Sequence, residues 1–156
     1  PILQFFDPKK PIVISVDASK DGIGSVLLQN SLPVAYASKA LNDVQKSYAQ
    51  IEKEMLAVVY GCEKFHQYIY GAKSVLVETD HKPLISIVKK SIELCPPRLQ
   101  RMLIRLQKYN VDLVYKKGSE LYIADALSRS YLKNSDLDLP NLETEEIEAQ
   151  ICSVID

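Results

Sequence analysis

Two nearly continuous apolar runs, residues 11–19 ("PIVISVDAS") and 74–80 ("SVLVETD"), limit the possible folds of this chain more than any other feature. Runs of this kind, rich in β-branched residues, are typical of strands that are buried on both faces of a sheet. Between them, apolar residues recur at helical spacing from Ile51 to Ile69, over about five turns. A strand, a long helix and a second strand form a crossover, so we expect the two strands to lie parallel in one sheet.

Shorter signals predict the remaining strands and helices. The turn sequences "KDG" and "NS" separate the first run from two more apolar runs, Ile23–Gln29 and Leu32–Ser38, which predicts an antiparallel meander of three strands. Ser47 is the candidate N-cap of the long helix, and Gly71 is the candidate residue just beyond its end. Four further elements are expected after residue 80: a short helix at Pro83–Val88, a helix that Pro96 and Pro97 open, a fifth strand at Val111–Lys117 and a last helix at Leu121–Leu132.

Length and composition favour one ordinary domain. The chain has 156 residues, of which 47% are hydrophobic and 25% charged, enough for a sizeable core. No apolar run reaches the roughly 18 residues of a membrane-spanning helix, and no signal peptide is recognisable. Cys62, Cys95 and Cys152 have no metal-binding spacing, which favours a reducing compartment without disulfide bonds. The opening "PILQFFDPKKP" is expected to be an interior part of a longer polypeptide.

The charges are unevenly distributed along the chain. Residues 131–156 hold one lysine and seven acidic residues, a net charge of −6, whereas residues 1–130 carry +5. A basic body with an acidic tail suits a domain that contacts a polyanion, but a solvated surface followed by a linker produces the same pattern. The segment after Pro140 has little apolar periodicity, and we interpret it as a linker or tail.

Four carboxylates occupy positions from which they can meet. Asp17 and Asp80 end two strands that are expected to be parallel, so both emerge at the edge where open α/β sheets place their sites. Glu54 lies at the border of the apolar stripe of the long helix, and Asp125 lies between two alanines early in the last helix. Each has a structural alternative, because the aspartates can cap a turn or a helix and Glu54 can be an ordinary flank residue.

Four converging carboxylates repel one another unless cations neutralise them. Oxygen ligands favour magnesium or manganese, and zinc is disfavoured because His66 and His81 are the only histidines and no CxxC motif occurs. Two such ions about 4 Å apart suit the hydrolysis of a phosphodiester. The four acids together therefore predict a metal-dependent nuclease, whereas each acid alone has a structural explanation.

The segments "ISVDAS", "EKEMLAVV", "VETDHKPL" and "YIADALSR" together resemble the ribonuclease H domain of reverse transcriptases from gypsy-like LTR retrotransposons. The resemblance implies an α/β fold with a five-stranded mixed sheet, in which strands 1–3 are antiparallel and strands 1, 4 and 5 are parallel, flanked by helices. It also implies a connection from a polymerase at residues 1–10, a ribonuclease H domain at 11–132, and an acidic, partly disordered linker towards an integrase at 133–156.

The resemblance implies that Asp17, Glu54, Asp80 and Asp125 are the catalytic, metal-binding acids. They would bind two Mg²⁺ ions, for which Mn²⁺ can substitute. Glu52 competes with Glu54, but "EMLA" matches the acidic helix motif of the wider family, and position 52 is angled away from the apolar stripe.

The cellular members of the wider ribonuclease H family differ from this chain in one loop. Cellular ribonucleases H carry a histidine before the last helix, whereas the corresponding loop here, "KKGSELYI", has none, as is common in gypsy-like domains. We therefore assign no histidine to the reaction. His81, beside Asp80, is interpreted as structural or as an orienter of its neighbour, and His66 as a helix-flank residue.

Contacts to a nucleic acid are suggested by two groups of residues. Arg98, Arg101, Arg105 and Lys108 form one basic helical stripe, which can track phosphates, face solvent or contact the rest of a polyprotein. The second group follows Asp17 and offers backbone contacts to an RNA strand: Ser19, Lys20 and Gly22.

The predicted function is cleavage of the RNA strand of RNA–DNA hybrids during reverse transcription, by hydrolysis with two metal ions. A catalytically weak or inactive scaffold of a retroelement polyprotein is the alternative, and another nuclease of the same fold, such as an integrase or resolvase, is a third. The resemblance implies the adjacent polymerase and integrase regions as partners. It also implies a location in retroelement particles in the cytoplasm and in the nucleus, without secretion or a membrane.

Overall fold

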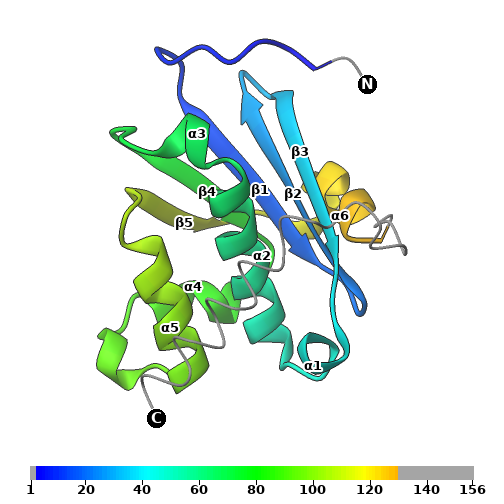
Figure 1. Cartoon of the computed structure of the whole chain (residues 1–156), viewed down its shortest axis with the longest axis vertical. Coiled ribbons are helices and arrows are strands. Elements are labelled where there is room, and N and C mark those ends of the chain that lie inside the picture. Colours follow the sequence, from blue (N-terminus) through cyan, green and yellow to red (C-terminus); the bar gives the residue numbers. More distant parts are fainter. Residues whose placement is uncertain (1–2, 130–156) are drawn as a thin grey trace.

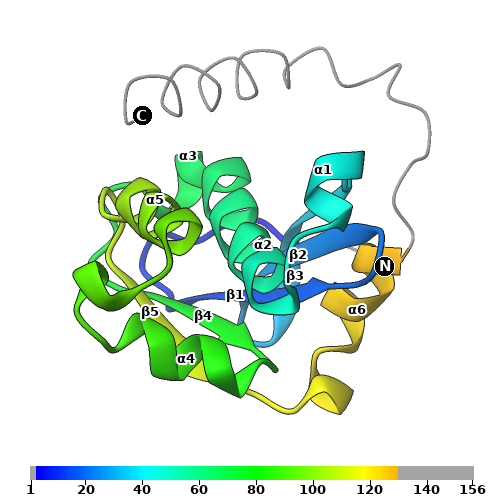
Figure 2. The ribbon, with the colours of Figure 1, turned by 90° about the horizontal axis from the view of Figure 1, so that it is seen from below.

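The computed structural model describes residues 3–129, which form a five-stranded sheet between helices (Figure 1; Figure 2). The strand order is β3-β2-β1-β4-β5. The pairs β1–β2 and β2–β3 are antiparallel, and β1–β4 and β4–β5 are parallel, which confirms the predicted mixed sheet. The strands are β1 (Ile12–Ala18), β2 (Gly22–Gln29), β3 (Leu32–Ala40), β4 (Val75–Thr79) and β5 (Val111–Tyr115).

The predicted helices appear in order, and the structure adds the short helix α1 and two 3₁₀ turns that the pattern did not predict. Their bounds are α1 (Asp43–Lys46), α2 (Gln50–Lys64), α3 (His66–Ile69), α4 (Lys82–Val88), η1 (Ile92–Leu94), α5 (Pro97–Leu106), η2 (Gly118–Glu120) and α6 (Tyr122–Arg129). Within residues 3–129, no helix combines the length and the apolar character needed to cross a membrane. The expected end of the last helix, and the acidic linker after it, lie outside the described residues.

The helix predicted from Ile51 to Ile69 is divided, and its predicted N-cap was wrong. Ser47 is the C-cap of α1, and its hydroxyl donates to the carbonyl oxygen of Val44 over 2.6 Å, so it ends a turn instead of starting a helix. The N-cap of α2 is Ala49, whose N–H is accepted by a Glu52 side-chain oxygen at 3.0 Å. Beyond the break after α2, Gly71 follows α3 with a φ of +79°, as expected of the residue beyond a helix end.

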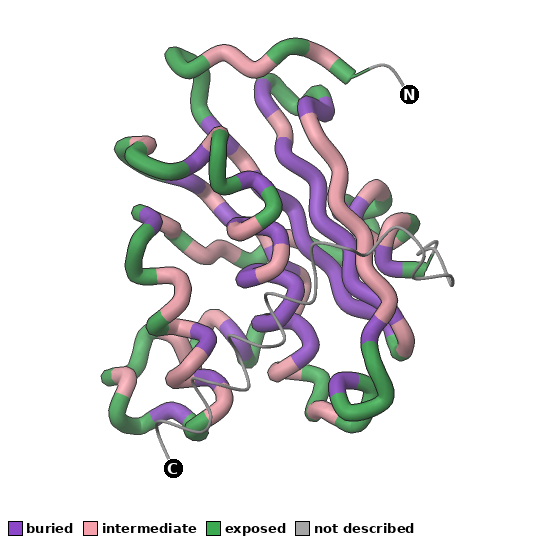
Figure 3. Tube along the Cα trace, in the orientation of Figure 1, coloured by how far each residue is buried: buried purple, intermediate pink, exposed green. Residues whose placement is uncertain are grey.

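The core lies between the sheet and α2 (Figure 3). Ile14 and Val16 of β1 are fully buried, and so are Val58 and Val59 of α2. α5 packs against α2, while α4 contacts both α2 and β5. This packing buries the first half of α2, the part that carries Glu54, against the ends of the central strands.

The opposite face of the sheet is covered by α6, and a glycine makes this contact possible. A Cβ atom on Gly24 of β2 would lie 2.5 Å from both the carbonyl oxygen of Ala124 and the backbone nitrogen of Ser128 in α6. The next residue, Ser25, points to the other face, where its hydroxyl donates to the carbonyl oxygen of Ala57 in α2 over 3.3 Å. Because side chains alternate along β2, Gly24 faces α6 and its neighbour Ser25 faces α2 on the other side of the sheet.

The segment before β1 is bonded to the β2–β3 hairpin. The hairpin turns at Asn30 and Ser31, whose φ angles of 53° and 63° suit a two-residue turn. Next to this turn, the Gln29 side chain accepts from the N–H of Asp7 over 2.9 Å and donates to the Asp7 carbonyl over 2.8 Å. The segment predicted as a connection to a polymerase is thus attached to the domain from Gln4 onward, where the backbone N–H donates to the carbonyl of Pro33 over 3.0 Å.

Candidate metal centre

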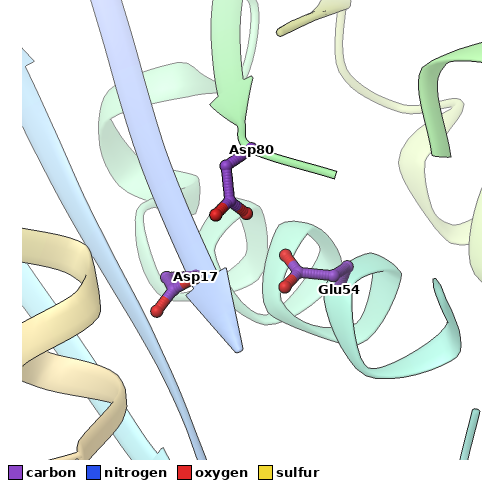
Figure 4. Close-up of side chains that lie close together, drawn as sticks. All are labelled: Asp17, Glu54 and Asp80. Atoms are coloured by element: carbon purple, nitrogen blue, oxygen red, sulfur yellow. The ribbon is translucent and has the colours of Figure 1, made fainter. Parts of the chain in front are cut away.

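Three of the predicted acids meet at one edge of the sheet. Asp17, Glu54 and Asp80 each offer a carboxylate oxygen, and these oxygens all lie within 4.8 Å of one another (Figure 4). Their carboxylates point towards one another from the end of β1, the first half of α2 and the residue after β4. The structure thus gathers residues that are far apart in the sequence around one small space.

The strand register explains why the two aspartates are neighbours. β1 and β4 are parallel, and Ser15 pairs with Glu78. Two residues further along each strand lie Asp17 and Asp80, and a step of two residues returns the side chain to the same face. The parallel register that the crossover requires therefore places both carboxylates at the same end of the sheet.

Burial makes this cluster reluctant to lose its protons. Asp17 and Glu54 are only 8% and 2% exposed, whereas Asp80 is the most accessible of the three. Burial, followed by the neighbouring acid Asp125, raises the pKa of Asp17 to about 7. Burial and the negative charges of Asp17 and Asp80 raise the pKa of Glu54 to about 8. A divalent cation offsets exactly this kind of repulsion, because its charge favours the ionised carboxylates.

Uncharged side chains orient two of the carboxylates. Ser128 of α6 donates its hydroxyl to Oδ2 of Asp17 over 3.0 Å. Gln50, one turn before Glu54, donates its amide to Oε1 of Glu54 over 3.2 Å and to the carbonyl of Ala18 over 3.3 Å. The other oxygen of Glu54, Oε2, accepts from Oγ1 of Thr79 over 3.5 Å, so three polar neighbours fix how the two buried acids lie in the cluster.

Asp125 lies beside the cluster and is not part of it. It neighbours Asp17 closely enough to raise the pKa of that residue, but it is outside the group of three whose oxygens converge. Its Oδ1 accepts from Nε of Arg129 over 3.0 Å, one turn further along α6. The four predicted acids are therefore arranged as a compact triad with a fourth, paired acid next to it.

The geometry distinguishes Glu54 from Glu52. Glu52 accepts from the backbone at the start of α2 and forms an ion pair with Arg98 at 2.8 Å. Glu54 is buried and faces the two aspartates. The cap alternative for Asp80 was wrong, because the N-cap of α4 is His81.

The histidines do not belong to the triad. The backbone N–H of His81 donates to Oγ1 of Thr79 over 3.2 Å, and partial burial lowers the pKa of His81, although Asp80 acts in the opposite direction. Nδ1 of His66 lies 2.6 Å from the hydroxyl of Tyr109, in a contact between α3 and the residues before β5. Both contacts are structural.

Two arginines of the basic stripe on α5 form ion pairs inside the domain. Arg98 pairs with Glu52 and lies over the ring of Tyr48 at 4.0 Å. Arg105 forms a two-pronged pair with Glu63, with distances of 2.9 and 2.7 Å. Both acids belong to α2, because α5 packs against that helix. Arg101 is partly exposed and Lys108 is exposed, so these two remain directed outward.

The residues after Asp17 also serve the fold. Ser19 is 9% exposed, and its hydroxyl donates to the carbonyl oxygens of Gly22 at 3.2 Å and Ser128 at 2.7 Å. The carbonyl of Lys20 accepts from Nζ of Lys53 over 3.1 Å, and the Lys20 residue itself is exposed. Of these three residues, Ser19 and Gly22 are buried and Lys20 is exposed, and the predicted backbone contacts to an RNA strand stay a prediction.

Three neighbours of the triad escaped the sequence analysis: Gln50, Gly118 and Ser128. Gln50 precedes Glu54 by four residues, so helical spacing could have indicated it. Ser128 follows Asp125 by three residues and lies within the quoted segment "ADALSR". Gly118 has no such signal, because it approaches Asp80 only through the packing of η2.

The donor set fits a hard divalent cation. All three converging groups are carboxylates, the ligands that Mg²⁺ and Mn²⁺ prefer. The described residues around them supply hydroxyl and amide donors to the carboxylates but no cysteine ligand, so the site matches oxygen-preferring ions. Asp17, Glu54 and Asp80 are the residues that would hold such ions.

A mixed sheet with this strand order, and carboxylates at the ends of two adjacent parallel strands, defines the ribonuclease H-like class of proteins. Residues 7–109 match the family model described as the RNase H-like domain found in reverse transcriptase, and the chain belongs to this family.

Two curated relatives place this domain within larger proteins. The chain is 40% identical over 133 residues to the retrovirus-related Pol polyprotein from transposon opus of Drosophila melanogaster, covering 82% of this chain and 13% of that protein. It is 35% identical over 132 residues to the Pol polyprotein from transposon gypsy of the same organism, covering 84% and 12%. The chain thus spans about an eighth of the length of these relatives.

A solved structure agrees with the fold. LC11-RNase H1, in a crystal structure with an RNA/DNA hybrid, superposes with a TM-score of 0.63 at 17% identity, covering 77% of this chain and 95% of that one. At this identity the similarity establishes the fold alone.

Proposed function

We propose that this domain is a ribonuclease H, an endonuclease that hydrolyses the RNA strand of RNA–DNA hybrids as part of a retrotransposon reverse transcriptase. The observation that carries the proposal is the convergence of three carboxylates within 4.8 Å in a domain of this family. A structural role explains such a cluster poorly, because like charges at this spacing destabilise the fold that holds them. The hybrid bound by LC11-RNase H1 supports the substrate class by analogy.

Asp17, Glu54 and Asp80 hold two Mg²⁺ ions in this proposal, with Asp125 as the fourth acid of the site. When bound, the ions activate water for attack on phosphorus and stabilise the leaving oxygen. Ser128 and Gln50 orient two of the carboxylates through the hydrogen bonds described above. The products are expected to carry a 3′-hydroxyl and a 5′-phosphate.

The test is a cleavage assay with a hybrid, a DNA duplex and an RNA duplex of one sequence, in Mg²⁺ and again in Mn²⁺. We expect cleavage of the RNA strand of the hybrid only. Asp17→Asn and Glu54→Gln should each lower the rate by more than about a hundredfold, since loss of a residue that merely orients a metal ligand already costs about 10- to 100-fold.

Asp112→Asn is the matched control, because Asp112 is an exposed residue of β5 away from the cluster. Its rate should equal that of the wild type. Cleavage at the wild-type rate by either active-site variant would remove that residue from the proposed site. A wild-type domain that binds no Mg²⁺ and cuts no hybrid would instead support the inactive scaffold.

A further inference from the structure

The turn η2 lies directly against the metal centre. A Cβ atom built on Gly118, the first residue of this turn, would lie 2.6 Å from Oδ2 of Asp80, 3.5 Å from its Cγ and 3.7 Å from its Cβ. The first separation is well below van der Waals contact. The backbone of the turn therefore covers the Asp80 carboxylate as closely as a residue without a side chain allows.

The backbone conformation does not explain the glycine at position 118. Among the glycines that the structure describes, only Gly71 has a positive φ, the region in which other residues are strained. Gly71 has nothing within 4 Å of its hypothetical Cβ, so its role is conformational. Gly118 is the reverse case: its φ is not positive, and the atoms that a Cβ would meet all belong to the side chain of Asp80.

The turn is held in place at both of its ends. Before it, the backbone N–H of Lys116 donates to the carbonyl of Thr79 over 2.8 Å, and Nζ of Lys116 pairs with Glu78 at 3.2 Å. After it, the side chain of Leu121 is buried, at 3% exposure, and anchors the end of the turn in the domain. Because both ends are anchored, a methyl group at position 118 would displace the accessible end of the Asp80 side chain more easily than the turn.

We propose that Gly118 is a positioning residue: by lying against Asp80, it restricts the carboxylate to the orientation that faces Asp17 and Glu54. The inference rests on the proposed function, because it concerns the same site. It adds to the proposed site a residue that has no side chain and acts only through Asp80. It also assigns a role to the loop that carries no histidine.

The direct test is Gly118→Ala, with Ser119→Ala as the control from the same turn, where residue 119 is exposed. We expect Gly118→Ala to bind Mg²⁺ about tenfold more weakly by calorimetry, and to need correspondingly more Mg²⁺ for half-maximal cleavage. At limiting Mg²⁺, kcat should fall while KM for the hybrid stays unchanged, because the substituted residue orients a metal ligand. The melting temperature should stay within about 2 °C of the wild type, since Asp80 can rotate.

A double-mutant cycle keeps the test decisive if Gly118→Ala unfolds the domain. In an Asp80→Ala background the clash disappears, so adding Gly118→Ala should change neither the melting temperature nor the residual Mg²⁺ binding. An equal loss of stability in both backgrounds would overturn the inference, as would wild-type Mg²⁺ affinity in the single variant. Calorimetry needs no turnover, so a wild-type domain that binds Mg²⁺ without cleaving would contradict only the proposed function.

Discussion

At the scale of single residues, the carboxylates of the triad oppose the fold that holds them. Asp17 and Glu54 are buried, and their pKa values are raised to about 7 and about 8 from ordinary values of 3.8 and 4.5. The folded domain therefore binds protons at these sites more tightly than the unfolded chain does. Without a cation, ionisation of the pair costs stability near neutral pH.

This leads to a prediction about pH. A carboxyl with a raised pKa contributes stability below its unfolded pKa, and that contribution is lost as pH rises through the folded value. For the metal-free protein, in buffer with a chelator, the free energy of unfolding should therefore fall by about 1–3 kcal/mol between about pH 5 and about pH 8. Saturating Mg²⁺ should remove most of this fall. Chemical denaturation at several pH values, with and without Mg²⁺, measures both effects.

Asp17→Asn provides the comparison, because the amide cannot ionise. This variant should be more stable than the wild type at about pH 8 in chelator and should depend less on pH. Asp112→Asn should behave like the wild type. A metal-free wild type whose stability rises over the same pH range would show that the two acids are not coupled as described.

At the scale of secondary-structure elements, α6 connects the sheet to the site. Gly24 lets the α6 backbone approach β2, and Ser38 of β3 donates its hydroxyl to the carbonyl of Leu127 over 2.5 Å. From this position α6 places Ser128 on Asp17 and Asp125 beside it. The geometry of the site thus depends on the packing of α6, which carries Asp125 but none of the three converging carboxylates.

Gly24→Ala tests this dependence. The added methyl would meet α6 backbone atoms at 2.5 Å, so the helix must move. We expect a loss of about 1–3 kcal/mol of stability, as for other overpacked sites, together with a decrease in cleavage from the shift of Ser128 and Asp125. Urea denaturation and the hybrid assay measure the two effects. Unchanged stability and rate would mean that α6 is not held against β2 at this residue.

At the scale of the whole molecule, residues 4–10, predicted as a connection, are bonded to the β2–β3 hairpin. The side chain of Gln29, 2% exposed, bonds to Asp7 twice and donates to the carbonyl of Lys10 over 3.2 Å. Phe6 also packs on Tyr68, with ring centroids 4.9 Å apart. These contacts hold the segment against the β2–β3 hairpin and α3.

Gln29→Ala should release this segment. Removing the amide leaves the partly buried N–H and carbonyl groups of Asp7 without this partner, so we expect a loss of about 1–2 kcal/mol and faster proteolysis between residues 3 and 10. Gln4→Ala, which removes bonds at a more exposed position, should have a smaller effect. Denaturation and limited proteolysis, followed by mass spectrometry, distinguish the two variants. Equal resistance of Gln29→Ala and wild type to protease would contradict the role of Gln29.

Much of this organisation could be predicted because its signals are local or follow from chain geometry. The periodicities of β1, α2 and β4 predicted a crossover and parallel strands, and the parallel strands placed Asp17 and Asp80 at one edge. The division of the long helix was missed, because Phe65 is apolar and continues the helical spacing while ending α2.

The chain alone thus determined which segments form strands and helices, and which acids can meet, since both follow from side-chain period and the handedness of the crossover. Only the packing of distant segments decided the rest. α5 lies on α2, so Arg98 and Arg105 are paired with acids of α2. η2 lies on Asp80, so a side chain at residue 118 would meet that carboxylate. Such contacts depend on the distance between atoms that no local pattern relates, and they appear only when the chain is folded.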